Sequence, residues 1–201
     1  MKKQKKRNNQ IAPFVVNFCK NISPETPILV PLRPLMGKPA NECFTLVPEH
    51  VSTYGGKQHI GWSIHVWKSV LIEAEFHCVW ESPEGELIDI TPKMFEAENI
   101  IFLPDSTKSY TGRQVDNIRK SISSDVNVTK FIRLAQEYYR YINHGDLADY
   151  HGEIEIKEDF IDQYNLMVEL ERNLIRKFGY GRGIATIGGF VRNHLPFSIV
   201  N

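Results

Sequence analysis

Residues 72–90 read IEAEFHCVWESPEGELIDI, and this stretch decides the predicted fold. Two runs of strand-forming residues flank the turn sequence at positions 82–85, which has proline early and glycine at its end. This pattern is typical of a β-hairpin with a three-residue loop, in which a type I turn is followed by a glycine bulge. That loop type pairs Ser82 with Glu86 and therefore predicts the register of both strands.

The predicted register gives the hairpin two distinct faces, because successive side chains of a strand point to opposite sides. On one face His77 and Asp89 are diagonal cross-strand neighbours, roughly 7–8 Å apart at Cα. A carboxylate at that position can hold an imidazole ring in one tautomer and stabilise its protonated form. The alternative interpretation is a surface ion pair on a solvated sheet face. The opposite face is apolar or thiol throughout and is predicted to face the core: Ala74, Phe76, Cys78, Trp80, Ile88 and Ile90.

The remaining sequence predicts an α+β fold, with an antiparallel β-sheet and packed helices. Residues 28–30, 60–67 and 100–103 are further strand candidates, and residues 60–67 alternate in the manner of a strand. Apolar side chains recur at helical spacing over residues 131–142 and 160–178. Gly179 is placed to end the second of these helices.

A shorter helix is expected from Asn41 to about residue 53, and it contains the first of the candidate catalytic residues. Asn41 is a favourable N-cap residue, and Gly55 and Gly56 should end the helix. Pro48 should kink this helix or split it in two. Cys43 then lies near the helix start, where the partial positive charge of the N-terminus favours a thiolate and lowers the pKa of the thiol.

Length and composition limit the domain organisation and the partners. The chain has 201 residues, 42% of them hydrophobic, which fits one soluble globular domain. We expect a disordered basic arm over residues 1–10 and a single α+β domain over 11–201, with its sheet core at about 41–103 and its helical part at about 113–179. Lys+Arg and Asp+Glu are both 24, which argues against a nucleic-acid partner. No apolar run of about 18 residues predicts a membrane span, and no secretory signal is recognised, so the predicted location is cytoplasmic.

The chain has three cysteines, Cys19, Cys43 and Cys78, and this number leaves room for a single reactive thiol. An odd number without close spacing does not fit a disulfide framework or a structural zinc site. Cys78 is on the core face of the hairpin and Cys19 has no partner in view, so both are expected to be packed and inert. Cys43 is therefore the candidate nucleophile.

The order of Cys43, His77 and Asp89 resembles that of the papain-like and transglutaminase-like cysteine enzymes. The strings NECF (41–44), EFHCVW (75–80) and IDITP (88–92) carry this resemblance, and the His-x-x-Trp and Asp-x-Thr-Pro patterns are similar to the transglutaminase-like ones in particular. The resemblance implies a papain-like/transglutaminase-like core, with Cys43 as nucleophile, His77 as general base and acid, and Asp89 as orienting residue. It implies peptidase, isopeptidase, deamidase or acyltransferase chemistry on a protein or peptide, with hydrolysis favoured and no metal or organic cofactor required.

Substrate-binding candidates and two competing functions complete the sequence-based interpretation. Asn41 could complete an oxyanion hole, and Gly55 and Gly56 could let a substrate chain approach closely. Trp62 and Trp80 are either core aromatics or walls of a substrate cleft. A non-catalytic protein-binding module on the same fold is the main alternative function. A metal-dependent hydrolase that uses His77, Asp89 and nearby Glu or His side chains is the second.

Overall fold

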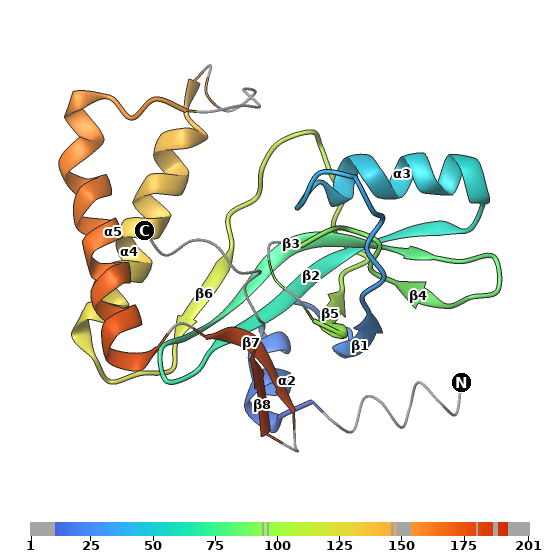
Figure 1. Cartoon of the computed structure of the whole chain (residues 1–201), viewed down its shortest axis with the longest axis horizontal. Helices are drawn as coiled ribbons and strands as arrows, with labels where there is room; N and C mark the ends of the chain where they lie inside the picture. The colour runs from blue at the N-terminus through green and yellow to red at the C-terminus, as the bar shows by residue number, and fades with distance from the viewer. Residues whose placement is uncertain are drawn as a thin grey trace.

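The computed structural model describes residues 11–93, 95, 97–145, 147, 154–179, 181–186 and 189–192 (Figure 1). The predicted basic arm, residues 1–10, lies outside the described residues. The helices are α2 (Pro13–Cys19), α3 (Cys43–Tyr54), α4 (Val126–Ile142) and α5 (Glu158–Phe178). The strands are β1 (Ile28–Pro31), β2 (Lys57–Trp67), β3 (Leu71–Glu81), β4 (Leu87–Ile88), β5 (Asn99–Pro104), β6 (Ile118–Ser121), β7 (Arg182–Thr186) and β8 (Gly189–Arg192).

The strands form one sheet in which every pair of named strands is antiparallel. The main path runs β1-β5-β2-β3-β4, while β6 pairs with β3 and β7 pairs with β2 and β8. The long hairpin of β2 and β3 is the centre of this sheet, because its register extends without interruption from the Lys57–Glu81 pair to the Trp67–Leu71 pair. Together with the four helices among the described residues, this sheet confirms the α+β class. The sheet also extends beyond the expected range of 41–103, since β1, β6, β7 and β8 lie outside it.

The predicted hairpin turn is confirmed, but its second strand is shorter than expected. The Ser82 N–H donates to the Glu86 carbonyl at 2.9 Å, and Gly85 has a φ of 83° that suits the bulge position. The strand β4 ends at Ile88, because the chain then pairs with the segment after β1. There the Asp89 N–H donates to the Pro31 carbonyl at 2.9 Å.

This pairing brings the two ends of the sheet path together, so the sheet curls back on itself. Leu32 forms a bridge with Asp89, directly after β1 and β4. Val30 of β1 and Val79 of β3 consequently belong to one buried cluster, although two strands separate β1 from β3 along the path. The concave face of the hairpin, which carries His77, is therefore enclosed. The alternative of a solvated face is wrong for this reason.

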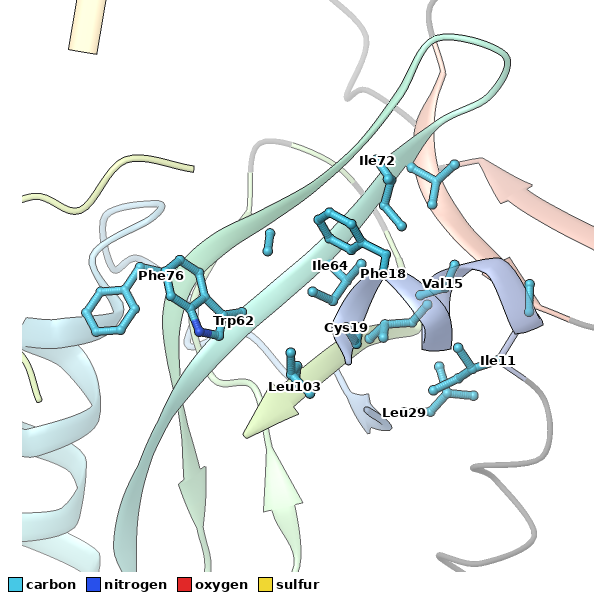
Figure 2. Packing of buried hydrophobic residues seen from close by; sticks show 14 residues of the cluster. Ile11, Val15, Phe18, Cys19, Leu29, Trp62, Ile64, Ile72, Phe76 and Leu103 are labelled. Atoms are coloured by element: carbon cyan, nitrogen blue, oxygen red, sulfur yellow. The ribbon is translucent and has the colours of Figure 1, made fainter. Parts of the chain in front are cut away.

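The outer face of the sheet is covered by α2 and α3 (Figures 1 and 2). The short helix α2 begins with a proline at its first position, where the missing N–H has no helical partner to lose. Figure 2 shows Ile64 and Leu103 of the sheet close to the side chains of α2, while Trp62 and Phe76 lie nearer to α3. These sheet residues form one buried hydrophobic cluster with residues of α2 and of the chain just before it, namely Ile11, Ala12, Val15, Phe18 and Cys19.

The helices α4 and α5 lie side by side at the other end of the molecule, as the apolar periodicity predicts (Figure 1). They pack against Trp67, Val70 and Leu71, at the turn between β2 and β3. The helix α5 ends where Gly179 adopts a φ of 78° and donates its N–H to Ile175, so the predicted end of this helix is confirmed. Among the described residues, none of the helices combines the length and the apolar character needed to span a bilayer.

The helix α3 differs from its prediction at its start and at Pro48. Its first residue is Cys43 and its N-cap is Glu42, so the expected N-cap role of Asn41 is wrong. Asn41 instead has a left-handed φ of 63°, and its N–H donates to the Pro92 carbonyl at 3.0 Å. Pro48 lies inside the helix without splitting it, because Leu46 and Val47 anchor this turn in the core. The expected end of the helix at Gly55 is confirmed.

Candidate functional site

The candidate site lies where α3 approaches an edge of β3 that neighbouring strands leave open. The strand β6 pairs with residues 71–74 of β3, and β4 pairs with residues 80–81. Between these two partners, the start of α3 packs against β3, and Cys43 and Cys78 belong to the same buried cluster. The gap between β4 and β6 thus lets a side chain of α3 reach residues 77 and 78 of the strand.

Cys43 lies at this gap, and its surroundings favour the ionised form of its thiol. A hydrogen bond from the Cys78 side chain is the strongest influence, and it lowers the pKa of Cys43 against the opposing effect of burial. The charge of His77, a hydrogen bond with its ring and the backbone N–H of Cys78 act in the same direction, so the pKa falls to about 5. The pKa of Cys78 is raised far above the ordinary range, because burial and the neighbouring thiolate both oppose its ionisation. One thiol is therefore ionised and the other remains its donor.

His77 connects Cys43 to Asp89. The Nε2 atom of His77 lies 3.0 Å from Oδ2 of Asp89. Since Nε2 faces the carboxylate, Nδ1 is the nitrogen that remains for Cys43. Burial and Lys93 oppose protonation of the ring, but the charges of Asp89 and Cys43 outweigh them and raise the pKa of His77 to about 9. At neutral pH these shifts favour a thiolate at Cys43 and an imidazolium at His77.

The carboxylate of Asp89 is fixed by the chain around it. Its Oδ1 accepts the N–H of Thr91 at 3.0 Å, which leaves Oδ2 to His77. Burial opposes its ionisation, but the charges of His77 and Lys93 prevail and hold the pKa of Asp89 well below its usual range. Asp89 is fully buried and His77 is only 1% exposed. The pair predicted from the hairpin register is therefore formed in a dry environment, where electrostatic interactions are strong.

A second polar group, in which Ser63 and His65 are buried and Glu75 is partly exposed, continues from this pair along the concave face. The Nε2 atom of His65 lies 3.1 Å from Oγ of Ser63 and 3.3 Å from Oε2 of Glu75. Burial opposes ionisation of Glu75, but the hydrogen bond from His65 and the charges of His65, Lys93 and His77 lower its pKa to about 2. Glu75 is therefore a fixed negative charge two residues before His77.

Lys93 is the residue of this site that sequence reasoning missed. Its Nζ atom lies 3.3 Å from Oδ2 of Asp89 and 3.4 Å from Nε2 of His77, and its side chain is only 2% exposed. The signal in the sequence was its position directly after the Asp-x-Thr-Pro string. Nothing local indicates that this lysine is buried, since the enclosure depends on the distant segment after β1 and on the bond between Asn41 and Pro92.

A cleft of about 650 Å³ opens beside the start of α3, and the buried Cys43 and His77 are not among its lining residues. Phe44 forms its aromatic wall and stacks on Phe76 on one side and on Tyr110 on the other, with ring centroids 5.1 and 4.1 Å apart. Glu75 brings its fixed charge to the same cleft. The other residues of the lining are Asn41, Glu42, Thr45, Gly112, Arg113, Gln114, Val115 and Asn117.

The structure brings one predicted substrate-binding residue to this cleft and places the others elsewhere. Asn41 lines the cleft. Gly55 and Gly56 follow the C-terminal end of α3, opposite Cys43, and Trp80 donates its ring N–H to the Gly55 carbonyl there at 2.9 Å. Trp62 is buried behind Phe76, and its ring N–H bonds to Asp105 at 3.0 Å.

The third functional hypothesis requires a metal site. In the described part of the chain, no group of three or more His, Cys, Asp or Glu side chains has an arrangement that could hold a metal ion. His59 pairs with Glu81, and His65 is engaged with Ser63 and Glu75. The histidines of β2 are therefore directed to separate partners rather than to a common centre with His77.

Comparisons of the whole chain with family models, with curated proteins and with solved structures gave no match. The functional assignment accordingly rests on the geometry and the electrostatics of the chain itself.

Proposed function

We propose that this protein is a cysteine-dependent amide-bond enzyme with a papain-like or transglutaminase-like site. The single observation that carries the proposal is the position of the His77 ring, which is hydrogen-bonded to Asp89 through Nε2 and lies close enough to Cys43 for its charge to lower the pKa of that thiol. A thiolate and a positioned imidazolium are the nucleophile and the general acid that acyl transfer through a thioester needs. This arrangement supports the resemblance in residue order.

The first half of the proposed reaction forms a thioester. The Sγ atom of Cys43 attacks the carbonyl carbon of an amide, and the electron pair of the carbonyl moves to its oxygen. When the tetrahedral intermediate collapses, the carbon–nitrogen bond breaks and His77 gives its Nδ1 proton to the leaving amine. The N–H groups of Cys43 and Phe44 precede the first hydrogen bonds of α3 and can bind the oxyanion, as donors at a helix N-terminus do.

The second half of the reaction regenerates the thiolate. A water molecule or an amine attacks the thioester, and His77 takes the proton of this nucleophile. The carbon–sulfur bond then breaks, and the imidazolium again faces a thiolate. Asp89 keeps the ring oriented throughout and stabilises its positive charge. Hydrolysis remains the favoured outcome, with deamidation and acyl transfer to an amine as variants of the same step.

The cleft beside the start of α3 supports a protein or peptide substrate. Its aromatic wall of Phe44, Phe76 and Tyr110 suits the apolar part of a side chain, and the polar groups around it suit a peptide backbone. A cytoplasmic location is part of the proposal, since a reducing compartment keeps such a thiol active.

Alkylation with limiting iodoacetamide at neutral pH tests the proposal. We expect labelling to be fastest at Cys43, because its pKa is lowered, whereas burial raises the pKa values of Cys19 and Cys78. Labelling sites are identified by peptide mass spectrometry. The His77→Ala variant should lose the rapid phase, and Cys19→Ala, which removes a buried thiol outside the site, should keep it. Equal and slow labelling of all three cysteines would contradict the proposal.

A non-catalytic binding module remains the second candidate, because one observation favours it. Cys43 is only 3% exposed and His77 1%, so a substrate reaches the thiolate only after a movement of the cleft wall. If the cleft binds peptides without chemistry, a peptide ligand should bind equally well to Cys43→Ala and to the wild type, and no thioester should accumulate. An acyl-Cys43 adduct from an activated ester would decide for the enzyme.

A further inference from the structure

Lys93 is a buried cation in contact with both partners of a buried ion pair. Its Nζ atom lies 3.3 Å from the same Oδ2 atom of Asp89 that His77 approaches at 3.0 Å. It also lies 3.4 Å from Nε2 of His77. A lysine is almost never buried this deeply without a specific partner, and the proposed reaction gives it no role of its own.

The protons at this contact can be placed by elimination. The Nε2 atom of an imidazole carries either one hydrogen or one in-plane lone pair. If it donates its hydrogen to Asp89, it cannot accept one from Lys93, so both nitrogens donate to Oδ2. The carboxylate is then shared between an imidazolium and an ammonium, and its other oxygen is occupied by the N–H of Thr91. When the ring is neutral, the same assignment keeps its one hydrogen on Nε2 and leaves the lone pair of Nδ1 for Cys43.

We propose that Lys93 is a positioning residue that shares Oδ2 of Asp89 with His77, keeps the ring proton on Nε2, and limits how tightly the ring holds its second proton. The inference rests on the proposed function, because it assigns Lys93 a part in preparing that same site. With Cys43 and Asp89 negative and His77 and Lys93 positive, the four groups are neutral together. A neutral cluster can be buried at much lower cost than one with a net charge.

The charges around His77 set the direction of the effect. Asp89 and Lys93 face the ring from the segment after β4, Cys43 from α3, and Glu75 lies on β3 and is bound by His65 of β2. Of Asp89, Lys93, Cys43 and Glu75, only Lys93 is positively charged and opposes protonation of His77. Replacing it with a neutral side chain removes this repulsion and leaves Asp89 to His77 alone. The imidazolium should then release its proton at higher pH.

The test is an NMR titration of the His77 ring, identified as the resonance missing from His77→Gln. In the wild type, the pKa of His77 should be about 9 and should fall when Cys43 is blocked with iodoacetamide. In Lys93→Met it should rise by about one pH unit or more. Lys93→Arg, which keeps the charge, and Lys38→Met, which removes an exposed lysine paired with Glu49 on α3, should leave it unchanged.

The outcomes separate the two proposals. If blocking Cys43 does not affect His77 in the wild type, the proposed function fails. If it does, but Lys93→Met and Lys93→Gln titrate like the wild type, only the role of Lys93 is refuted. If neither Lys93→Met nor Lys93→Gln folds, a measurement on the wild type tests the role of Lys93. Its Lys93 ammonium should then give a slowly exchanging signal with a through-space contact to the His77 ring, and exchange as fast as that of exposed lysines would overturn the inference.

Discussion

Replacing Cys43 with alanine should change how the stability of the protein depends on pH. The folded-state pKa of Cys43 is lowered from 9.0 to about 5, so its stabilising contribution is fully present above pH 9 and is lost as the pH falls through 5. The folded-state pKa of His77 is raised from 6.5 to about 9, so its contribution is present below pH 6.5 and is lost as the pH rises through 9. The two contributions therefore have opposite slopes.

The expected magnitude follows from counting protons. Between pH 5 and 6.5 the unfolded chain holds one proton more than the folded protein at these two sites, and the stability rises with pH. Between pH 6.5 and 9 both states hold one proton, and the two sites add no slope. One and a half pH units at roughly 1.4 kcal/mol each give a rise of about 2 kcal/mol, followed by a plateau.

The Cys43→Ala variant retains only the contribution of His77, which is smaller than in the wild type because the charge of Cys43 no longer raises the pKa of that ring. The free energy of unfolding of the wild type, relative to that of the variant, should thus increase by about 2 kcal/mol between pH 5 and 6.5 and should keep increasing above it. Urea unfolding followed by far-ultraviolet circular dichroism measures both proteins at each pH. Groups common to both proteins cancel in the difference.

Cys19→Ala is the matched control for this experiment. Cys19 is a buried thiol of α2, and burial raises its pKa from 9.0 to about 12, so it does not titrate between pH 5 and about 8 in either state. The difference between the wild type and Cys19→Ala should be constant over this range. If the Cys43→Ala profile runs parallel to that of the wild type in the same way, Cys43 is not ionised in the folded protein and the reasoning is refuted.

Three further substitutions test other parts of the structure. Gly56→Ala should lower the free energy of unfolding in the urea assay by about 3 kcal/mol or more, because the new Cβ would overlap a backbone carbonyl of β3 and the residue would keep a strained positive φ. Gly55→Ala has space for its Cβ and only the strain of a positive φ, so it should lose about 1–2 kcal/mol in the same assay. Cys78→Ala should raise the pKa of Cys43 by about one pH unit or more, because it removes the hydrogen bond that lowers this pKa. The rate of alkylation of Cys43, measured against pH, should shift to higher pH accordingly. Cys78→Ser retains a donor and should shift this profile less. Thr91→Val should leave the free energy of unfolding unchanged or raise it by about 1 kcal/mol, because the buried hydroxyl of Thr91 has no hydrogen-bond partner within the described residues. A clear loss of stability in urea unfolding would show that this hydroxyl does have a partner.

The hairpin and the contact of His77 with Asp89 could be predicted because both depend on local information. A loop of known type fixes the register, and the register fixes which side chains share a face. The long helices could be predicted from their apolar period for the same reason. The start of α3 was predicted to within two residues, but Asn41 took the wrong role because its backbone is bound to the distant Pro92.

Burial of the site could not be predicted, since it depends on pairing between distant segments. The segment after β1 closes over Asp89, and this closure turns an apparently solvated face into an enclosed one. The same closure buries Lys93. Short elements such as α2, β6 and β7 are likewise stabilised by their neighbours in space, and their sequences carry too few periods to reveal them.

The most direct measurement is the ultraviolet absorbance of the thiolate at neutral pH, compared between the wild type and Cys43→Ser. The wild type should contain one thiolate more than the variant at pH 7, and this signal should disappear with a midpoint near pH 5 as the solution is acidified. His77→Ala should move that midpoint upward. Equal absorbance of the wild type and Cys43→Ser at pH 7, with a thiolate appearing only at the pH of an ordinary cysteine, would contradict the account.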